Sequence, residues 1–334
     1  MGLNTNGFKL GGVLVEKNII MGKNKDTKKE WIMADLTIEV GENQRINLSL
    51  FQNKLKADGN ENSIYTGIAT IRDQFKSLNS QVTNKVGNPD AKPIKHEATT
   101  VATREECDFV SANNEVTLSM NHYVKDGKLQ SNFRLSTRFV NRAKETDSKV
   151  PYIEGNLQGI ITEKGVEKED SNGNRYVETE LTVPTFREGY TKSNGEVVED
   201  SIVVDKFKLV LKDNEDAIDY CMSIFGVNTV CCIGVEPMIK VVSEEPKEPI
   251  STQKRGFGKI ASLEPTTKIV REIRVVGGYD LEEREYVEDK AFNYELFEKA
   301  VAKYDKDLED KLNENGKETT TTRGFGKKGG SVPF

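Results

Sequence analysis

The chain has 334 residues, of which 36% are hydrophobic and 31% are charged, and its formal net charge is −6. A hydrophobic fraction of this size fills globular cores, which excludes a globally disordered protein. No apolar run reaches the roughly 18 residues of a membrane-spanning helix, and the first residues lack the basic and apolar regions of a secretory signal. The four cysteines form no CxxC pair and no evenly spaced framework, which indicates reduced thiols and a cytoplasmic protein.

The charge is distributed unevenly along the chain. Residues 1–150 carry 22 Lys and Arg against 18 Asp and Glu, whereas residues 151–250 carry 10 against 20. The remaining residues, 251–334, carry 16 of each sign. A polyanion is therefore expected to prefer the first region over the second.

Strand signals dominate the first 150 residues. Alternating apolar residues predict strands over residues 7–20, 30–40, 45–51, 115–124 and 129–141. Apolar residues three and four apart predict a helix over 63–78, and a loop is expected at 84–95. Asp126-Gly127 separates the last two strands and is a strong hairpin signal.

The second region repeats this order. Strands are predicted over residues 152–163, 176–184, 205–212 and 229–242. A helix is predicted over 214–225, and segments 8–14 and 152–160 are faintly similar and fall at matching places. A five-stranded barrel with a helix between its third and fourth strands is the oligonucleotide/oligosaccharide-binding (OB) fold. The sequence therefore predicts a mainly β protein with short helices, built from two tandem OB-like barrels, although any small β-barrel gives a similar pattern.

Beyond residue 245 the sequence changes character. A strand is expected at 267–276 and a helix at 293–312, and the glycine-rich end of the chain is predicted to be disordered. These signals divide the chain into four parts. They are a basic first OB-like domain (1–148), an acidic second OB-like domain (149–245), a linker with a helical segment (246–318) and a flexible basic tail (319–334).

A row of arginines is the clearest candidate for a binding face. Arg134, Arg138 and Arg142 have the same parity in the predicted strand, so they are expected on one side of it. Leu135 and Phe139 have the opposite parity and are expected in the core. Guanidinium groups bind phosphates and stack on bases, which favours nucleic-acid binding over the alternative of an ordinary solvated strand face.

Aromatic residues on the polar faces of other strands support the same interpretation. Trp31 is out of phase with the apolar residues of its strand, Phe51 shares the parity of Arg45, and Tyr123 shares that of neighbouring Ser and Asn residues. Exposed aromatic rings beside basic groups suit sequence-tolerant stacking on single-stranded bases. The alternative is that each ring lies at a strand end and closes the barrel mouth.

The pentapeptide Arg-Gly-Phe-Gly-Lys occurs twice. Its candidate nucleic-acid-binding residues are Arg255, Phe257, Lys259, Arg323, Phe325 and Lys327. Glycine keeps such segments flexible while the cations contact phosphates and the ring stacks on a base. The alternative is a linker motif without a ligand. The spacing of a phosphate-binding loop is absent, so nucleotide hydrolysis is not expected.

The chain ends in Val332-Pro333-Phe334, which resembles the terminal tripeptide that bacterial single-stranded DNA-binding proteins use to dock partner enzymes. An acidic run precedes that tripeptide in the family, whereas lysines and glycines precede it here. These features together resemble the OB-fold single-stranded DNA-binding proteins of phages and mobile elements of Gram-positive bacteria. The resemblance rests on the strand order, the hairpin leading into the arginine row, and the tail.

The resemblance implies a non-catalytic protein that coats replication or recombination intermediates. Single-stranded DNA would be its ligand, with RNA left open, and replication or recombination proteins would dock at the C-terminus. The location would be cytoplasmic, in the bacterial host if the protein is phage-encoded. No catalytic residue, cofactor or metal site is expected. The alternatives are a phage structural or interaction scaffold without nucleic-acid binding, and a nuclease whose carboxylates converge on a metal.

Overall fold

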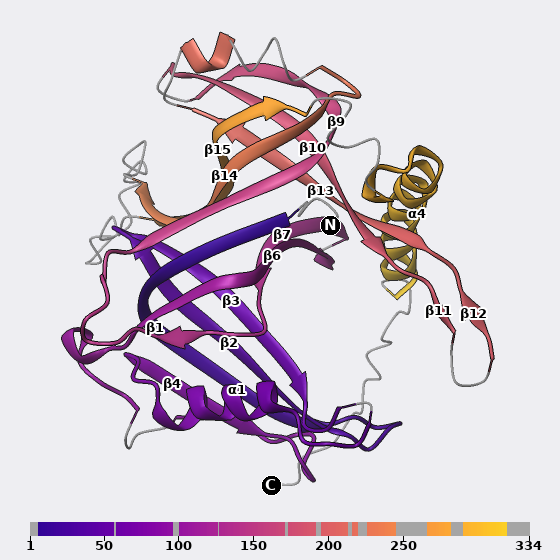
Figure 1. Ribbon diagram of the computed structural model, residues 1–334. Coiled ribbons are helices and arrows are strands. Elements are labelled where there is room, and N and C mark those ends of the chain that lie inside the picture. Colours follow the sequence, from indigo (N-terminus) through magenta and orange to yellow (C-terminus); the bar gives the residue numbers. More distant parts are fainter. Residues whose placement is uncertain are drawn as a thin grey trace, which may run out of the picture.

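The computed structural model describes residues 6–56, 58–95, 100–125, 127–170, 173–191, 195–212, 216–219, 226–244, 266–281 and 290–318 (Figure 1). They form mainly β-strands, with helix α1 (Ser63–Gln74) in the first half and helix α4 (Tyr294–Glu318) near the end of the chain. The prediction of a mainly β protein with short helices and a C-terminal helix is therefore confirmed.

Five strands of the first half pair in a closed cycle, which we call the first ring. They are β1 (Asn6–Lys23), β2 (Glu30–Gly41), β3 (Gln44–Asn53), β6 (Phe109–Lys125) and β7 (Lys128–Ser136). β1 pairs with β2, β2 with β3, β3 with β7, β7 with β6, and β6 again with β1; only the β3–β7 pairing is parallel. Burial alternates strictly along most of β2, as its apolar periodicity predicts.

Short elements surround this ring. They are β4 (Asn79–Asn84), β5 (Ile94–Lys95), β8 (Asn141–Arg142) and the 3₁₀ turn η1 (Arg104–Glu106). The side chain of Asn62 caps α1 by accepting a hydrogen bond from the backbone of Ile64 at 3.1 Å. α1 buries Ile68 and Ile71 against the ring and ends at Gln74, four residues before the predicted end. β4 lies parallel to β1, a strand that the sequence did not indicate.

Five further strands form the second ring in the same order. They are β9 (Tyr152–Glu169), β10 (Arg175–Arg187), β13 (Ser201–Leu211), β14 (Val230–Glu244) and β15 (Thr266–Asp280). β15 is longer than the predicted strand at 267–276; it pairs with β14 along its length and parallel with β13. Of the predicted helix at 214–225, only residues 216–219 lie in the described part, and they are helical. A small hairpin, β11 (Tyr190–Thr191) and β12 (Val197–Val198), extends from β10 and β13 (Figure 1).

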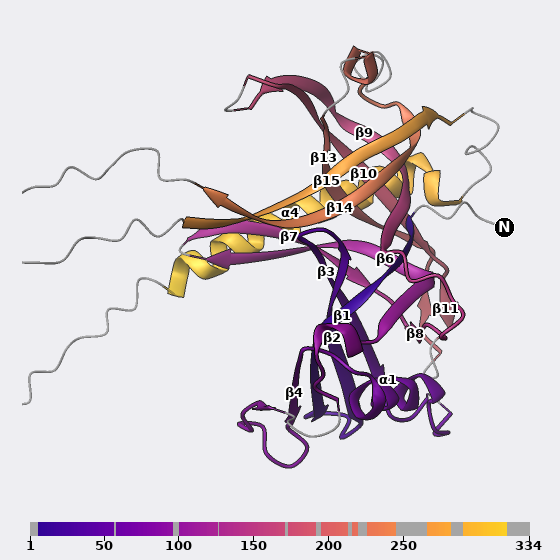
Figure 2. The same cartoon turned by 90° about the vertical axis from the view of Figure 1, so that its left-hand side faces the viewer.

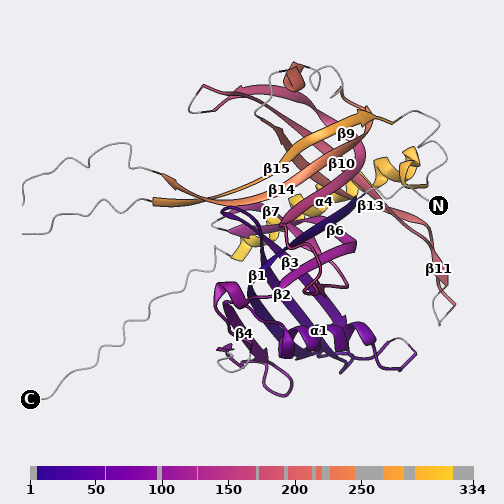
Figure 3. The ribbon, with the colours of Figure 1, turned by 60° about the vertical axis from the view of Figure 1, so that its left-hand side comes forward.

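The two rings join through the antiparallel pairing of β1 with β9. In this pairing Phe8 faces Gly155 and Gly11 faces Tyr152, so each ring contributes one aromatic residue and one glycine. A Cβ atom on Gly155 would lie 2.1 Å from the Phe8 ring, and one on Gly11 would lie 2.5 Å from the Tyr152 ring. Residues 8–11 and 152–155 of the two similar segments thus pair with one another, and Figures 2 and 3 show the two halves meeting along these strands.

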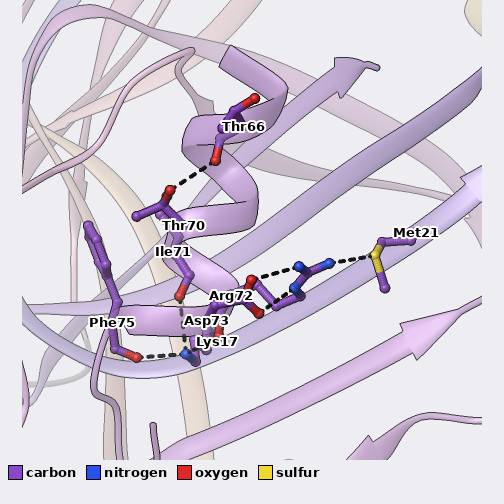
Figure 4. A network of polar contacts seen from close by, with 8 residues as sticks. All are labelled: Lys17, Met21, Thr66, Thr70, Ile71, Arg72, Asp73 and Phe75. Carbon is purple, nitrogen blue, oxygen red and sulfur yellow. Dashed lines mark hydrogen bonds and ion pairs between the residues drawn. The ribbon is translucent and has the colours of Figure 1, made fainter. Parts of the chain in front are cut away.

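A buried lysine connects β1 to the end of α1. Lys17 is fully buried, and its Nζ donates hydrogen bonds to the carbonyl oxygens of Ile71, Arg72 and Phe75 at 3.1, 2.8 and 2.6 Å (Figure 4). Carbonyl groups at a helix C-terminus lack partners within the helix and attract positive charge. Burial lowers the pKa of Lys17 from 10.5 to about 8, although Asp73 and Asp108 favour its charged form.

Replacement of Gly155 by Ala should destabilise the junction of the rings by about 1–3 kcal/mol, because the added methyl group overlaps the buried Phe8 ring. Gly67→Ala is the matched control. Gly67 lies within α1 with no atom within 4 Å of an added Cβ, so this change should stabilise the helix by up to about 1 kcal/mol. Urea unfolding measures both; equal midpoints for G155A and the unchanged protein would contradict the described pairing.

Lys17 should make stability depend on pH. Since its pKa in the folded protein, about 8, lies below the ordinary value of 10.5, the unfolded chain binds more protons between these pH values. The free energy of unfolding should therefore rise with pH across this window. In Lys17→Met this contribution disappears, and about 1–3 kcal/mol is lost because the carbonyl groups of Arg72 and Phe75 lose their hydrogen bonds from Nζ. Urea unfolding of both proteins from pH 8 upward tests this, and a stability difference that does not change with pH would disprove it.

Candidate nucleic-acid interface

A cleft of about 1120 Å³ lies where β1, β9 and the outer face of the first ring meet. Lys9, Arg134 and Arg138 are its cations, and none of the described residues that line it is Asp or Glu. Its remaining polar residues are hydroxyls and amides: Asn6, Ser49, Asn113, Thr117, Ser119, Ser136, Thr137, Asn156 and Gln158. Such a lining offers positive charge and hydrogen-bond donors to a phosphodiester backbone.

Arg134 on β7 is held in place by two neighbouring strands. Its Nε donates to Ser49 Oγ at 2.6 Å, and its Nη2 lies 3.1 Å from Asp35 Oδ1. Ser49 Oγ in turn donates to the same Asp35 oxygen at 2.5 Å. The Arg134 side chain remains 46% exposed. The guanidinium group is therefore oriented by the sheet yet accessible from the cleft.

The predicted row of three arginines on one strand is wrong. β7 ends at Ser136, and just beyond it Thr137 Oγ1 accepts a hydrogen bond from the backbone N–H of Phe139, a local contact where the chain leaves the strand. Arg138 still reaches the cleft. Phe139, expected in the core, is 49% exposed.

Arg142 lies away from the cleft. It belongs to β8, and its guanidinium carbon lies 5.5 Å from the centroid of the Phe75 ring. Its Nη1 is 3.5 Å from the carbonyl oxygen of Gln74 and 3.7 Å from Asp108 Oδ2. These contacts place Arg142 at the C-terminal end of α1, where a cation is favourable.

The three candidate aromatic residues differ in exposure. Phe51 lines the cleft and is 54% exposed. Trp31 is partly buried, with its ring over Gly22 and its centroid 5.8 Å from that of Phe51. Tyr123 is exposed and shares its face of β6 with Ser119, about 13 Å along the strand. Phe51 and Tyr123 therefore present exposed ring surface, whereas Trp31 packs against Phe51.

Other predicted site residues lie elsewhere. Arg45 is at the opposite end of β3 from Phe51 and pairs with Glu39 at 3.8 Å. The two pentapeptides and the C-terminal tripeptide lie outside the described residues; they comprise Arg255, Phe257, Lys259, Arg323, Phe325, Lys327, Val332, Pro333 and Phe334.

Sequence reasoning missed Lys9 and the amides of the second ring. Lys9 alternates with the buried Phe8 and Leu10, which is the available signal that it points outward. Asn156 and Gln158 lie on β9, and nothing local in the sequence indicates that they face the first ring. Only the pairing of β1 with β9 brings these groups together.

The second ring carries the opposite charge at the matching position. The parallel pairings Leu48–Leu135 and Leu209–Ile273 are equivalent, so Glu272 stands where the first ring has Arg134. Lys212 and Arg274 donate to the Glu272 carboxylate at 2.6 and 2.7 Å. Burial favours the neutral acid, but these hydrogen bonds hold the pKa of Glu272 below its usual value. These two cations of the second ring are therefore both bound to the Glu272 carboxylate.

Helix α4 packs on the second ring and reaches the β6–β7 hairpin. Its apolar residues, including Phe297, cover Ile202 and Val204 of β13. Tyr304 Oη lies 2.5 Å from His122 Nε2, and His122 Nδ1 lies 2.7 Å from Ser131 Oγ. Burial raises the pKa of Tyr304 to about 12, so its hydroxyl stays protonated at neutral pH. The helix thus holds one face of the hairpin, while Tyr123 is exposed on the other.

A model of the YorF protein family matches residues 4–315. The chain belongs to the YorF family. No curated protein is similar to this YorF-family chain in sequence. In the part of the chain that the structure describes, no helix is long and apolar enough to cross a membrane. Within the same residues, no group of three or more His, Cys, Asp or Glu side chains is placed to hold a metal ion.

Among solved structures, the YorF-family chain is similar to the wild-type single-stranded DNA-binding protein of Thermus aquaticus, with 9% identity, a TM-score of 0.43, and coverage of 84% of this chain and 94% of that one. A Plasmodium falciparum single-stranded DNA-binding protein in complex with single-stranded DNA matches 39% of this chain and 94% of its own, with 12% identity and a TM-score of 0.24. The small single-stranded DNA-binding protein of Streptomyces coelicolor matches 39% and 95%, with 11% identity and a TM-score of 0.21.

Removal of the Tyr304 hydroxyl should loosen the β6–β7 hairpin, because the hydrogen bond to His122 is lost. In Tyr304→Phe we expect faster amide hydrogen exchange over residues 121–132. Tyr294→Phe, an exposed residue of the same helix, is the control and should leave exchange there unchanged. Identical exchange in both variants would show that α4 does not hold the hairpin.

Proposed function

We propose that this chain binds single-stranded DNA without sequence preference, as a non-catalytic coat on replication or recombination intermediates. The observation that carries the proposal is the cleft beside β1 and β9. It combines three cations with the exposed ring of Phe51, and no carboxylate is among its described lining residues. Phosphates would lie against Lys9, Arg134 and Arg138.

The exposed aromatic residues favour single strands over duplexes. A ring on a strand face can stack only on a base whose own face is free, and bases within a duplex are already stacked on each other. Phe51 borders the cleft, and Tyr123 lies further along the same face of the hairpin. Bases leaving the cleft would therefore meet Tyr123 on the hairpin.

We also propose that each ring is an OB-type barrel and that the two have unequal roles. The first ring would hold the nucleic acid. The second ring, with Glu272 at the position of Arg134 and α4 over part of β13, would mainly support the first. The two Arg-Gly-Phe-Gly-Lys segments would add phosphate and base contacts, and the C-terminal Val332-Pro333-Phe334 would recruit replication or recombination proteins.

Fluorescence anisotropy of labelled oligo-dT and of a matched duplex tests the proposal. We expect tight binding of oligo-dT, weak binding of the duplex, and a decrease of log K with log salt of about 0.7 per phosphate contacted. Lys9→Ala/Arg138→Ala should reduce this salt slope by about 1.4. Phe51→Ala should cost about 1–3 kcal/mol of binding free energy with little change in slope.

The matched control is Lys164→Ala/Arg187→Ala, which removes two exposed cations of the second ring. It should leave the affinity for oligo-dT unchanged. Absence of oligo-dT binding by the unchanged protein at low salt would disprove the proposal and favour an interaction scaffold. Equal losses in the control and cleft variants would show that only overall charge matters.

A further inference from the structure

A second recess, of about 540 Å³, lies at the other end of β3. Three arginines from three separate elements line it: Arg45 on β3, Arg104 in η1 and Arg271 on β15. Arg45 and Arg104 belong to the first half of the chain, whereas Arg271 comes from the second ring. The recess therefore lies at a junction between the rings, away from the β1–β9 pairing.

The two rings contact each other directly beside this recess. Gln44, at the start of β3, pairs with Lys240 of β14. The Gln44 side chain donates to Glu236 Oε1 at 3.2 Å and to the carbonyl oxygen of Pro237 at 3.4 Å. Because β15 pairs with β14, these contacts fix the position of Arg271 on β15 relative to Arg45 on β3.

Two carboxylates, Glu39 and Glu42, also line the recess, and Glu39 contacts two of the arginines in the way that a bound anion would. Glu39 Oε2 lies 3.8 Å from Arg45 Nε, and Glu39 Oε1 contacts the guanidinium group of Arg104. The Glu39 side chain is 14% exposed, whereas those of Arg45 and Arg104 are 51% and 56% exposed. Two guanidinium groups thus converge on one carboxylate while keeping much of their surface accessible, an arrangement that also suits a phosphate.

The outer face of β3 connects the recess to the cleft. Phe51 and Ser49 line the cleft, and the next two outward residues, Asn47 and Arg45, line the recess. Alternate residues of a strand are about 6.8 Å apart, so this row spans about 20 Å. No acidic residue of β3 interrupts the row.

We propose that Arg45, Arg104 and Arg271 form a second binding site for the phosphodiester backbone, which a single strand reaches along β3 after leaving the cleft. The inference rests on the proposed function and extends it to the second ring, through Arg271. Glu39 orients two of the arginines in the absence of nucleic acid and competes with the incoming phosphate. Loss of its charge therefore strengthens binding.

Oligonucleotide length separates the two sites. Oligo-dT of about 4 nucleotides occupies the cleft alone, whereas oligo-dT of about 16 nucleotides reaches both sites. In Arg104→Ala/Arg271→Ala we expect about tenfold weaker binding of the longer oligonucleotide, a salt slope smaller by about 1.4, and unchanged binding of the shorter one. In Glu39→Gln we expect the longer oligonucleotide to bind about two- to fivefold more tightly.

Lys164→Ala/Arg187→Ala removes the same charge elsewhere and should bind both oligonucleotides like the unchanged protein. If Arg104→Ala/Arg271→Ala does not fold by circular dichroism, Arg271→Ala alone is measured, with an expected slope change of about 0.7. Unchanged binding of the longer oligonucleotide by the arginine variants would overturn this inference while leaving the proposed function intact. Failure of the unchanged protein to bind either oligonucleotide would overturn the proposed function itself.

Discussion

The antiparallel pairing of β1 with β9 is the constraint on which the rest of the structure depends. Each strand presents an aromatic ring to a glycine of the other, and neither glycine has room for a side chain. Close backbone approach at these two positions allows Phe8 to be buried and one hydrophobic core to run through both rings. The same pairing places Asn156 and Gln158 of the second ring beside Lys9 of the first, so the cleft exists only because the rings are joined in this way.

The two rings share their strand order but differ in the charged side chains at equivalent positions and in how those side chains are paired. In the first ring, Arg134 is oriented by Ser49 and Asp35 and remains accessible from the cleft. At the equivalent position of the second ring, Glu272 is only 10% exposed and is bound by Lys212 and Arg274. The side chains of Lys212 and Arg274 are only 28% and 30% exposed, so they offer a phosphate less accessible surface than Arg134 does. The same strand order therefore carries two different arrangements of charge.

Helix α4 links the second ring to the β6–β7 hairpin of the first. A two-stranded hairpin is marginally stable by itself. Here the contact between His122 and Tyr304 supports one face of the β6–β7 hairpin, and Lys206 lies 5.7 Å from the centroid of the Tyr304 ring. Support from one side leaves the opposite face, with Tyr123, open to solvent. The position of this aromatic residue therefore depends on a helix that follows it by about 180 residues in the chain.

Local patterns in the sequence determined the strands of both rings and the mainly β class, because alternation of apolar residues reports directly which side of a strand is buried. They also indicated that Phe51, Tyr123 and Arg134 are exposed, since parity along a regular strand is a local property. The parity argument failed beyond Ser136, where β7 ends, so Arg142 lies at the C-terminal end of α1 and Phe139 is exposed. Only the tertiary structure decided the cleft, the recess and the partner of Lys17. Each of these is formed by residues far apart in the sequence, and the strand pairings that bring them together depend on shape and burial, which no single segment encodes.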